Sequence, residues 1–116
     1  MIEFAVDALM YHDIDDIIKQ MLEGRKVMVI CKDYGEVTYE YQLAAEKLSK
    51  INGVKCHMHI PQIGGPFGMI RFCDPGDAEH LLKGLENVKV FFTPEGLETA
   101  TISLLMRVNM ASRGSN

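Results

Sequence analysis

The feature that most constrains this chain is a strand-forming run that is too apolar to be exposed on either face. Residues 88–92 read Val-Lys-Val-Phe-Phe, so β-branched and aromatic side chains follow one another with one interruption. Such a run is typical of a strand in a parallel sheet that helices cover on both faces. A helix stop at Gly84 precedes the run, and Thr93 with Pro94 provides a helix start after it. We therefore expect helix, buried strand and helix in succession.

The same alternation runs through the rest of the chain. Apolar residues at helical spacing predict helices over residues 14–22, 39–51, 75–83 and 94–108, with Asp13, Asp74 and Thr93 at their starts as caps. Glu40 is expected in solvent on the second helix, and Thr101 belongs to the apolar stripe of the last. Apolar or alternating runs predict further strands over residues 2–6, 26–31, 54–60 and 69–73. Strands that alternate with helices are typical of βαβ units. The predicted fold is a single α/β domain over residues 1–116, with a mostly parallel sheet flanked by helices in three layers.

Length and hydropathy fit one domain with its own core. A chain of 116 residues buries roughly two thirds of its unfolded surface without staples. No apolar run approaches the ~20 residues that span a bilayer, so we expect no membrane association. The first residues carry an acid at Glu3 and no basic cluster, which predicts no targeting peptide and a cytoplasmic location.

Charge and cysteine content narrow the class of partner. The formal net charge is −4, with Lys and Arg spread along the chain, so the long-range field repels nucleic acid unless one face is locally basic. We expect no autonomous nucleic-acid binding. The three cysteines, Cys31, Cys56 and Cys73, form no close pair and lie in or beside apolar runs. We interpret them as reduced, buried and unreactive thiols.

Parallel strands present chemistry at their carboxyl ends, because the loops there meet at one edge of the sheet. The loop after residues 26–31 begins with Lys32 and Asp33, and the strand over residues 69–73 is followed by Asp74. Thr93 and Glu95 follow the central strand. These five residues are the candidate ligand-binding residues, and no residue is assigned as catalytic.

Other polar groups each have a structural explanation beside a functional one. The glycines of residues 64–68 provide backbone N–H groups for an anion, but glycines before a hairpin more often form a tight turn. His57 and His59 share one face of a predicted strand, yet two histidines without a firm third ligand do not define a metal site. We favour the turn and two solvent-facing histidines, and we assign no metal and no cofactor.

The charged residues of the first and last predicted helices also have a structural and a functional explanation. Asp13, Asp15 and Asp16 fit the first turn of a helix, where the helix dipole favours acids without any metal. Arg107 and Arg113 suit a helix C-terminus and equally a phosphate or an acidic partner. The last predicted helix has apolar residues off its main stripe, so it is apolar on more than one side. These residues, which indicate a partner surface or a second copy of the chain, are Ile102, Met106 and Met110.

The order of these features resembles the front half of P-loop NTPases of the helicase and viral terminase large-subunit type. The resemblance covers nearly the whole chain and is carried by pattern. It includes an apolar strand like residues 24–31, a hairpin like residues 67–72, a segment like residues 77–84 and the central strand 88–92. It implies a P-loop-NTPase-like fold.

The resemblance lacks the catalytic parts of that family. Residues 8–13 lie where the phosphate loop is expected, but they contain no Gly, no Lys and no Ser or Thr. A phosphate loop needs those residues to hold the anion and its magnesium ion. The expected adjacent acids after the central strand are replaced by Thr93, Pro94 and Glu95. The resemblance therefore implies a scaffold that has lost its nucleotide chemistry.

Two functions of different classes remain open. The first is a non-catalytic module, of a kind that a phage genome encodes, which binds a protein partner or self-associates. The second is a small-molecule or nucleotide-binding α/β protein, and by extension an enzyme, with its site at the carboxyl edge. The sequence favours the first.

Overall fold

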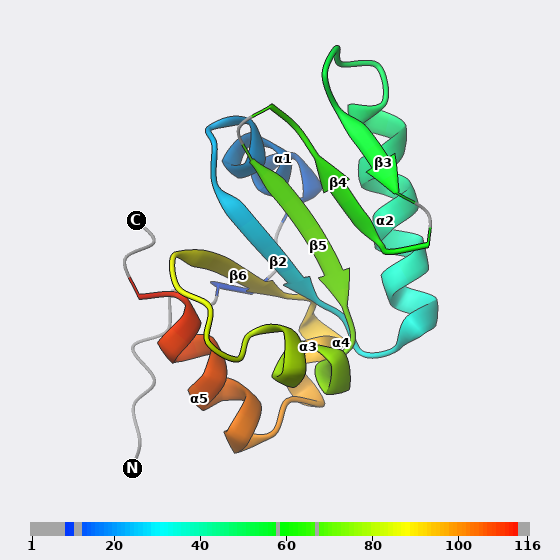
Figure 1. The fold of residues 1–116 in the computed structure, drawn as a ribbon. Coiled ribbons are helices and arrows are strands. Elements are labelled where there is room, and N and C mark those ends of the chain that lie inside the picture. The colour runs from blue at the N-terminus through cyan, green and yellow to red at the C-terminus, as the bar shows by residue number, and fades with distance from the viewer. Residues whose placement is uncertain (1–8, 11–12, 58, 67, 114–116) are drawn as a thin grey trace.

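One open sheet runs through the molecule, and helices lie on both of its faces (Figure 1). The computed structural model describes residues 9–10, 13–57, 59–66 and 68–113. In chain order the elements are β1 (Leu9–Met10), α1 (Ile14–Leu22), β2 (Lys26–Ile30), α2 (Tyr34–Leu48), β3 (Lys55–His57), β4 (Gln62–Gly64), β5 (Met69–Cys73), α3 (Pro75–Leu81), β6 (Val88–Phe92), α4 (Pro94–Glu98) and α5 (Ile102–Ala111).

The strand order across the sheet is β1-β6-β2-β5-β4-β3. The first four strands in this order are parallel, whereas β4 is antiparallel to both of its neighbours. β6 and β2 pair over their full lengths, from Val88 opposite Lys26 to Phe92 opposite Ile30. The expected α/β architecture with a mostly parallel sheet is therefore present, with β4 as the antiparallel exception.

Alternate side chains of the central strands feed two separate cores. The first core cluster contains Val27 and Val29 of β2 with buried residues of α1 and α2, among them Ile17 and Ala44. The second core cluster contains Met28 and Ile30 of the same strand with Val90 and residues of α3 and α5. Because successive side chains of a strand point to opposite faces, β2 and β6 are covered on both faces.

Several local signals have the predicted outcome. The strand predicted over residues 88–92 is β6. Asp13 caps α1, and Asp74 caps α3 by accepting a hydrogen bond from the backbone N–H of Asp77 at 2.8 Å. Thr93 caps α4 in the same way, by accepting from the N–H of Gly96 at 2.9 Å. Gly84 has a positive φ of 78° after α3, which is the left-handed conformation that ends a helix.

The start of α2 was predicted wrongly. The helix begins at Tyr34 with Asp33 as its N-cap, not after Thr38. Asp33 Oδ1 accepts from the backbone N–H of Glu36 at 2.9 Å, so the segment read as a loop is the first helical turn. Glu40, which the helical pattern placed in solvent, is only 8% exposed. The helix begins more than one turn earlier than predicted and ends at Leu48 instead of Ile51, and its buried face includes a carboxylate.

The region between α2 and β5 also differs from the prediction. The strand expected over residues 54–60 is shorter, covering Lys55–His57, and Ile60 is exposed. A strand that was not predicted, β4, follows at Gln62–Gly64 and buries Ile63 completely. Residues 62–63 had been assigned to no element, and Gly64 had been placed in the predicted turn over residues 64–68. Short strands on a half-covered sheet carry a weak pattern, because few of their side chains must be apolar.

The helix predicted over residues 94–108 is two helices. α4 ends at Glu98 and α5 begins at Ile102, with Thr101 as the N-cap that accepts from the N–H of Leu104 at 3.1 Å. Thr101 had been counted in the apolar stripe. Its side chain bonds the backbone instead, which is what Thr does at a helix start.

The N-terminal prediction is partly outside the described residues, since the strand expected over residues 2–6 falls there. Leu9 and Met10, which were expected in a phosphate-loop position, form β1 and pair in parallel with Phe91 and Phe92. Only residues 11–13 then separate β1 from α1. A phosphate loop of the form GxxxxGK[ST] is longer than that connection. No helix among the described residues is long and apolar enough to span a bilayer.

Candidate functional site

Two neighbouring strands end side by side and lead into helices on opposite faces of the sheet. β2 leads into α2, which packs in the first core cluster, and β6 leads into α4, whose Leu97 packs against the second. In open α/β sheets a crevice for ligands forms where neighbouring connections diverge in this way. The carboxyl ends of β2 and β6 are therefore the place where a site is expected.

Close packing of α4 on the end of β2 sets the geometry of this edge. The backbone N–H of Thr93 donates to the carbonyl of Ile30 at 3.0 Å. A Cβ on Gly96 would overlap that same carbonyl oxygen and lie 2.9 Å from Thr93 Oγ1. Glycine at position 96 thus lets the first turn of α4 touch the β2 backbone, which holds Thr93 against the loop after β2.

Four polar side chains form one connected group at this edge. Glu36 Oε1 accepts a hydrogen bond from the backbone N–H of Lys32 at 2.9 Å and another from Thr93 Oγ1. The ammonium group of Lys32 forms an ion pair with Glu95. The hydrogen bond to Glu95 and its negative charge raise the pKa of Lys32. The group links the first turn of α2 to the first turn of α4.

The structure brings together four of the five predicted site residues. An open hollow of about 410 Å³ lies at this edge, and Lys32, Asp33 and Glu95 line it. Thr93 is buried just beneath, where it bonds Glu36. Asp74 is not part of the hollow, because it follows β5 and its carboxylate caps α3.

Three residues of the hollow were not predicted: Gly35, Glu36 and Tyr39. Glu36 had a readable signal, since Asp33 and Glu36 have the spacing of a capping box. In that motif the acid at the third helical position reaches back to the backbone N–H of the N-cap. Glu36 reaches one residue further, to the N–H of Lys32. Reading residues 32–36 as a loop concealed it.

The electrostatics of this edge do not suit a phosphate group. Asp33, Glu36 and Glu95 contribute three carboxylates to the hollow, against the one ammonium of Lys32. A helix N-terminus binds an anion through its free backbone N–H groups. Here Asp33 Oδ1 and Thr93 Oγ1 already accept from those groups in α2 and α4.

The thiols near this edge are held in their neutral form. Burial raises the pKa of Cys31, and the negative charges of Glu36 and Glu40 raise it further. Burial also raises the pKa of Cys73 to about 12. Nucleophilic cysteines need a lowered pKa, so neither thiol is suited to attack. Cys56 is half-buried, and burial raises its pKa as well.

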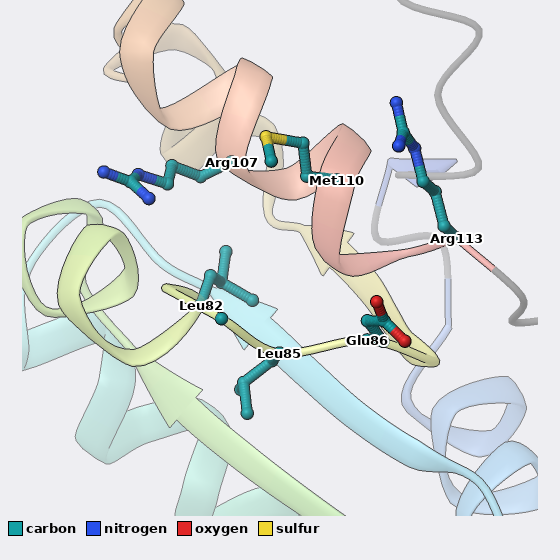
Figure 2. A pocket seen from close by; sticks show the side chains of 7 residues that line it. Leu82, Leu85, Glu86, Arg107, Met110 and Arg113 are labelled. Carbon is teal, nitrogen blue, oxygen red and sulfur yellow. The ribbon is translucent and has the colours of Figure 1, made fainter.

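A second hollow lies between α5 and the segment that follows α3. Its volume is about 140 Å³, and Leu82, Leu85 and Met110 give it an apolar lining. Figure 2 shows Arg107 and Arg113 at its two ends, with their guanidinium groups directed away from each other. The two arginines predicted as a possible grip for one phosphate therefore do not converge on one point.

The remaining candidates have structural roles. The Gly65 N–H donates to the Gly68 carbonyl at 2.8 Å, so this segment is a turn. His57 and His59 are exposed, and within the part of the chain that the structure describes no group of three His, Cys, Asp or Glu residues could hold a metal ion. Asp15 forms an ion pair with Lys47 at 2.8 Å, which ties α1 to α2.

Comparisons with protein-family models, with curated proteins and with solved structures find no match for this chain. The function must therefore be argued from the geometry of the chain itself.

Proposed function

We propose that this chain is a non-catalytic α/β module, P-loop-NTPase-like in pattern, that acts by protein interaction through the outer face of α5. The observation that carries the proposal is a row of apolar side chains on that face. Ile102, Met106 and Met110 are 64%, 51% and 55% exposed. They are spaced four residues apart on one helix, so they lie on one side of it.

The row on α5 continues onto the neighbouring segment. Met110 lines the second hollow together with Leu85, which is 42% exposed (Figure 2). Single exposed apolar residues need no explanation, but a contiguous row with arginines at its border is typical of an interaction surface. Arg107 and Arg113 supply that border.

A second copy of the chain is the partner that the row fits best. The three side chains are placed symmetrically about Met106. In an antiparallel pairing of two α5 helices, Ile102 of each copy meets Met110 of the other and Met106 meets its own equivalent. Such a self-complementary surface is what a two-fold interface requires. One helix pair buries less than about 1,000 Å², which predicts a weak dimer.

The interior of the carboxyl edge supports the non-catalytic part of the proposal. Its side chains bond one another: Lys32 to Glu95, and Thr93 to Glu36. A catalytic edge needs groups that are directed at a substrate. The alternative, a small-molecule or nucleotide site, is supported by the open hollow beside these residues.

Sedimentation equilibrium over a range of protein concentrations tests the α5 surface. We expect a monomer–dimer equilibrium with a Kd of roughly 10 µM to 1 mM. Met106→Glu should abolish it, because two like charges would meet at the symmetry axis. Leu22→Glu is the matched control, since Leu22 is 47% exposed on α1 and should leave the equilibrium unchanged. A protein that is monomeric at all concentrations, and whose α5 amide NMR signals do not shift with concentration, would contradict self-association.

A thermal-shift assay with ATP, GTP and Mg²⁺ separates the two classes of function. A ligand that binds only the folded state raises the melting temperature, with about 2.7 kcal/mol of stabilisation at a hundredfold excess over Kd. We expect no shift. A reproducible rise that Lys32→Ala removes would favour the carboxyl-edge site over the interaction module.

A further inference from the structure

Half of the sheet presents one face that no described helix covers. We call this surface the open face; it consists of the side chains of β3 and β4, and of Met69 and Arg71 in β5, that point to the side of the second core cluster. Cys73, at the end of β5, points to the same side but is buried against α3 in that cluster. Strand pairing places His57, Gln62 and Arg71 next to one another across it, and Lys55, Gly64 and Met69 in the adjacent row. Lys26 of β2 continues the second row.

Helices pack on the other face of these strands and beyond them, not on the open face. Ile63, Ile70 and Phe72 point into the first core cluster with α1 and α2. α3 and α5 pack over β6 and β2 in the second core cluster. Figure 1 shows the same arrangement, with α2 behind β3 and β4 and with α3 and α5 below. The side chains of the open face are accordingly exposed or half-buried.

The open face is basic in a chain that is acidic overall. It carries Lys26, Lys55, His57 and Arg71, whereas the formal net charge of the chain is −4. Among the described residues the three recorded ion pairs involve Arg25, Lys32 and Lys47, and none involves a residue of the open face. Arg71 acts on the Cys73 thiol together with Asp74 and Asp77, so its charge is partly balanced, whereas no ion pair recorded in the described part of the chain balances Lys26 or Lys55. The part of this surface near Lys55 is therefore complementary to an acidic partner.

Arg71 is held in place at the centre of the open face. Its inner nitrogen, Nε, is buried and has no hydrogen-bond partner among the described residues. The residue as a whole is half-buried, so its outer end is what reaches solvent. Arg71 therefore adds positive charge to the open face two strands in from the edge, beyond direct contact with a segment that pairs with β3.

The edge of the sheet adds a second element of recognition. β3 is the last strand in the order, so its outer backbone groups have no strand partner among the described residues. Lys55 and His57 are two residues apart on that strand and point to the open face. A strand that paired with β3 and had acids at every second position would place carboxylates beside both.

We propose that an extended acidic segment of another protein adds to the sheet beside β3 and pairs its carboxylates with Lys55 and His57 on the open face. Nucleic acid is less well matched. Among the described residues the open face carries no Phe, Tyr or Trp for bases to stack on. The net charge also opposes a highly charged polymer over a distance of a Debye length. This site is independent of α5.

The test is binding of a synthetic peptide with Glu at alternate positions and Thr or Val between them, measured by NMR and calorimetry at low salt. We expect binding with a Kd below about 1 mM and the largest amide shifts in residues 55–57. The double variant Lys55→Gln with His57→Gln should weaken binding about tenfold, since both side chains that face the added strand are removed. Lys19→Gln with Lys50→Gln removes at least as much charge from exposed sites elsewhere and should change the Kd less than about twofold.

Each other outcome overturns the proposal. The proposal is wrong if the peptide does not bind. It is also wrong if both double variants weaken binding equally, because that result would indicate non-specific attraction. Pairing with β3 would also be excluded if proline at two successive positions left the Kd unchanged, because one of the two backbone N–H groups must point to β3 and proline has none. If a single-stranded oligonucleotide of equal charge bound more tightly than the peptide at the same residues, the surface would be assigned to nucleic acid. If the double variant unfolds, Lys55→Gln alone is used, with an expected weakening of about threefold.

Discussion

The two halves of the sheet differ in how many of their faces are covered. β2 and β6 lie between two layers of helices, and four residues of each five-residue strand are buried. β3 and β4 have a core on one side only, and Ile63 is their one buried residue. The doubly covered half holds the fold together, whereas the singly covered half leaves side chains available to a partner.

The two halves of the sheet also differ in whether their polar side chains bond one another. At the ends of β2 and β6, Glu36 accepts from Thr93 and Lys32 pairs with Glu95, so the chain satisfies its own polar groups there. On the open face, Lys55 and Arg71 have no partner among the described residues. At the carboxyl edge the polar side chains bond one another beside an open hollow, whereas no ion pair recorded among the described residues involves the basic side chains of the open face. Substitutions in each half can separate these two roles.

The largest effect is expected from Phe92→Ala in the doubly covered half. Phe92 is fully buried at the end of β6, so its removal leaves a cavity between β6, α3 and α5. We expect a loss of about 4 kcal/mol in the free energy of unfolding. Urea denaturation measures it. Ile60→Ala, at a residue 48% exposed beside β3, should lose less than about 0.5 kcal/mol, and a similar loss in both variants would remove the contrast between the halves.

Gly96→Ala tests the close approach of α4 to β2. The added Cβ would overlap the Ile30 carbonyl oxygen, and backbone atoms cannot move aside as a flexible side chain can. We expect a loss of about 3 kcal/mol. Gly76→Ala in α3 is the matched control, because its nearest neighbour would be Asp74 Oδ1 at 3.6 Å. That change should be neutral or stabilise the protein by about 0.5 kcal/mol.

The same contrast explains what the sequence predicted well. β6 was predicted with its observed boundaries, because burial on both faces requires an almost unbroken apolar run. β4 was missed, because a three-residue strand with one buried side chain carries too little periodicity to recognise. The candidate site was predicted in four of its residues, because the carboxyl ends of parallel strands must meet. The open face was not predicted, since it depends on the pairing of β3, β4 and β5, which is not written in any one segment.

The helix starts were predicted correctly only where the capping residue was recognised. Asp13, Asp74 and Thr93 were recognised as caps because a proline or an apolar stripe followed each of them. Asp33 and Thr101 were not, although both cap helices. In each case the cap lies inside a segment that had already been given another role, a loop in one and a continuous helix in the other.

Thr93→Val removes the hydroxyl that joins the two helix starts at the carboxyl edge. Thr93 is 1% exposed, and its Oγ1 accepts from the Gly96 N–H and donates to Glu36. We expect a loss of about 2 kcal/mol in the free energy of unfolding, because the buried N–H of Gly96 loses its acceptor and Glu36 loses a donor. Thr93→Ser keeps the hydroxyl and should lose less than about 1 kcal/mol. Equal losses in both would show that the methyl group, not the hydrogen bonds, stabilises this edge.

The buried thiol at the end of β5 predicts a loss of stability at alkaline pH. The folded-state pKa of Cys73 is about 12, above its ordinary value of 9.0. Its contribution is therefore fully present below pH 9 and is lost as the pH rises towards 12. One unit above the ordinary value, the loss is about 1.4 kcal/mol. Urea denaturation at pH 9 and one unit higher should show a smaller drop in the free energy of unfolding for Cys73→Ala than for the wild type. An equal drop would assign the effect to other groups.

The smallest effect on stability is expected from Lys55→Gln on the open face. Lys55 is exposed on the edge strand and forms no ion pair among the described residues, so its removal should change the free energy of unfolding by less than about 0.5 kcal/mol. At low salt the change should be in the stabilising direction, because one of several neighbouring cations is removed, and added salt should reduce it. Urea denaturation at two salt concentrations measures both. A loss above about 1 kcal/mol would mean that Lys55 holds the fold together, and the two halves of the sheet would then not divide stability from recognition.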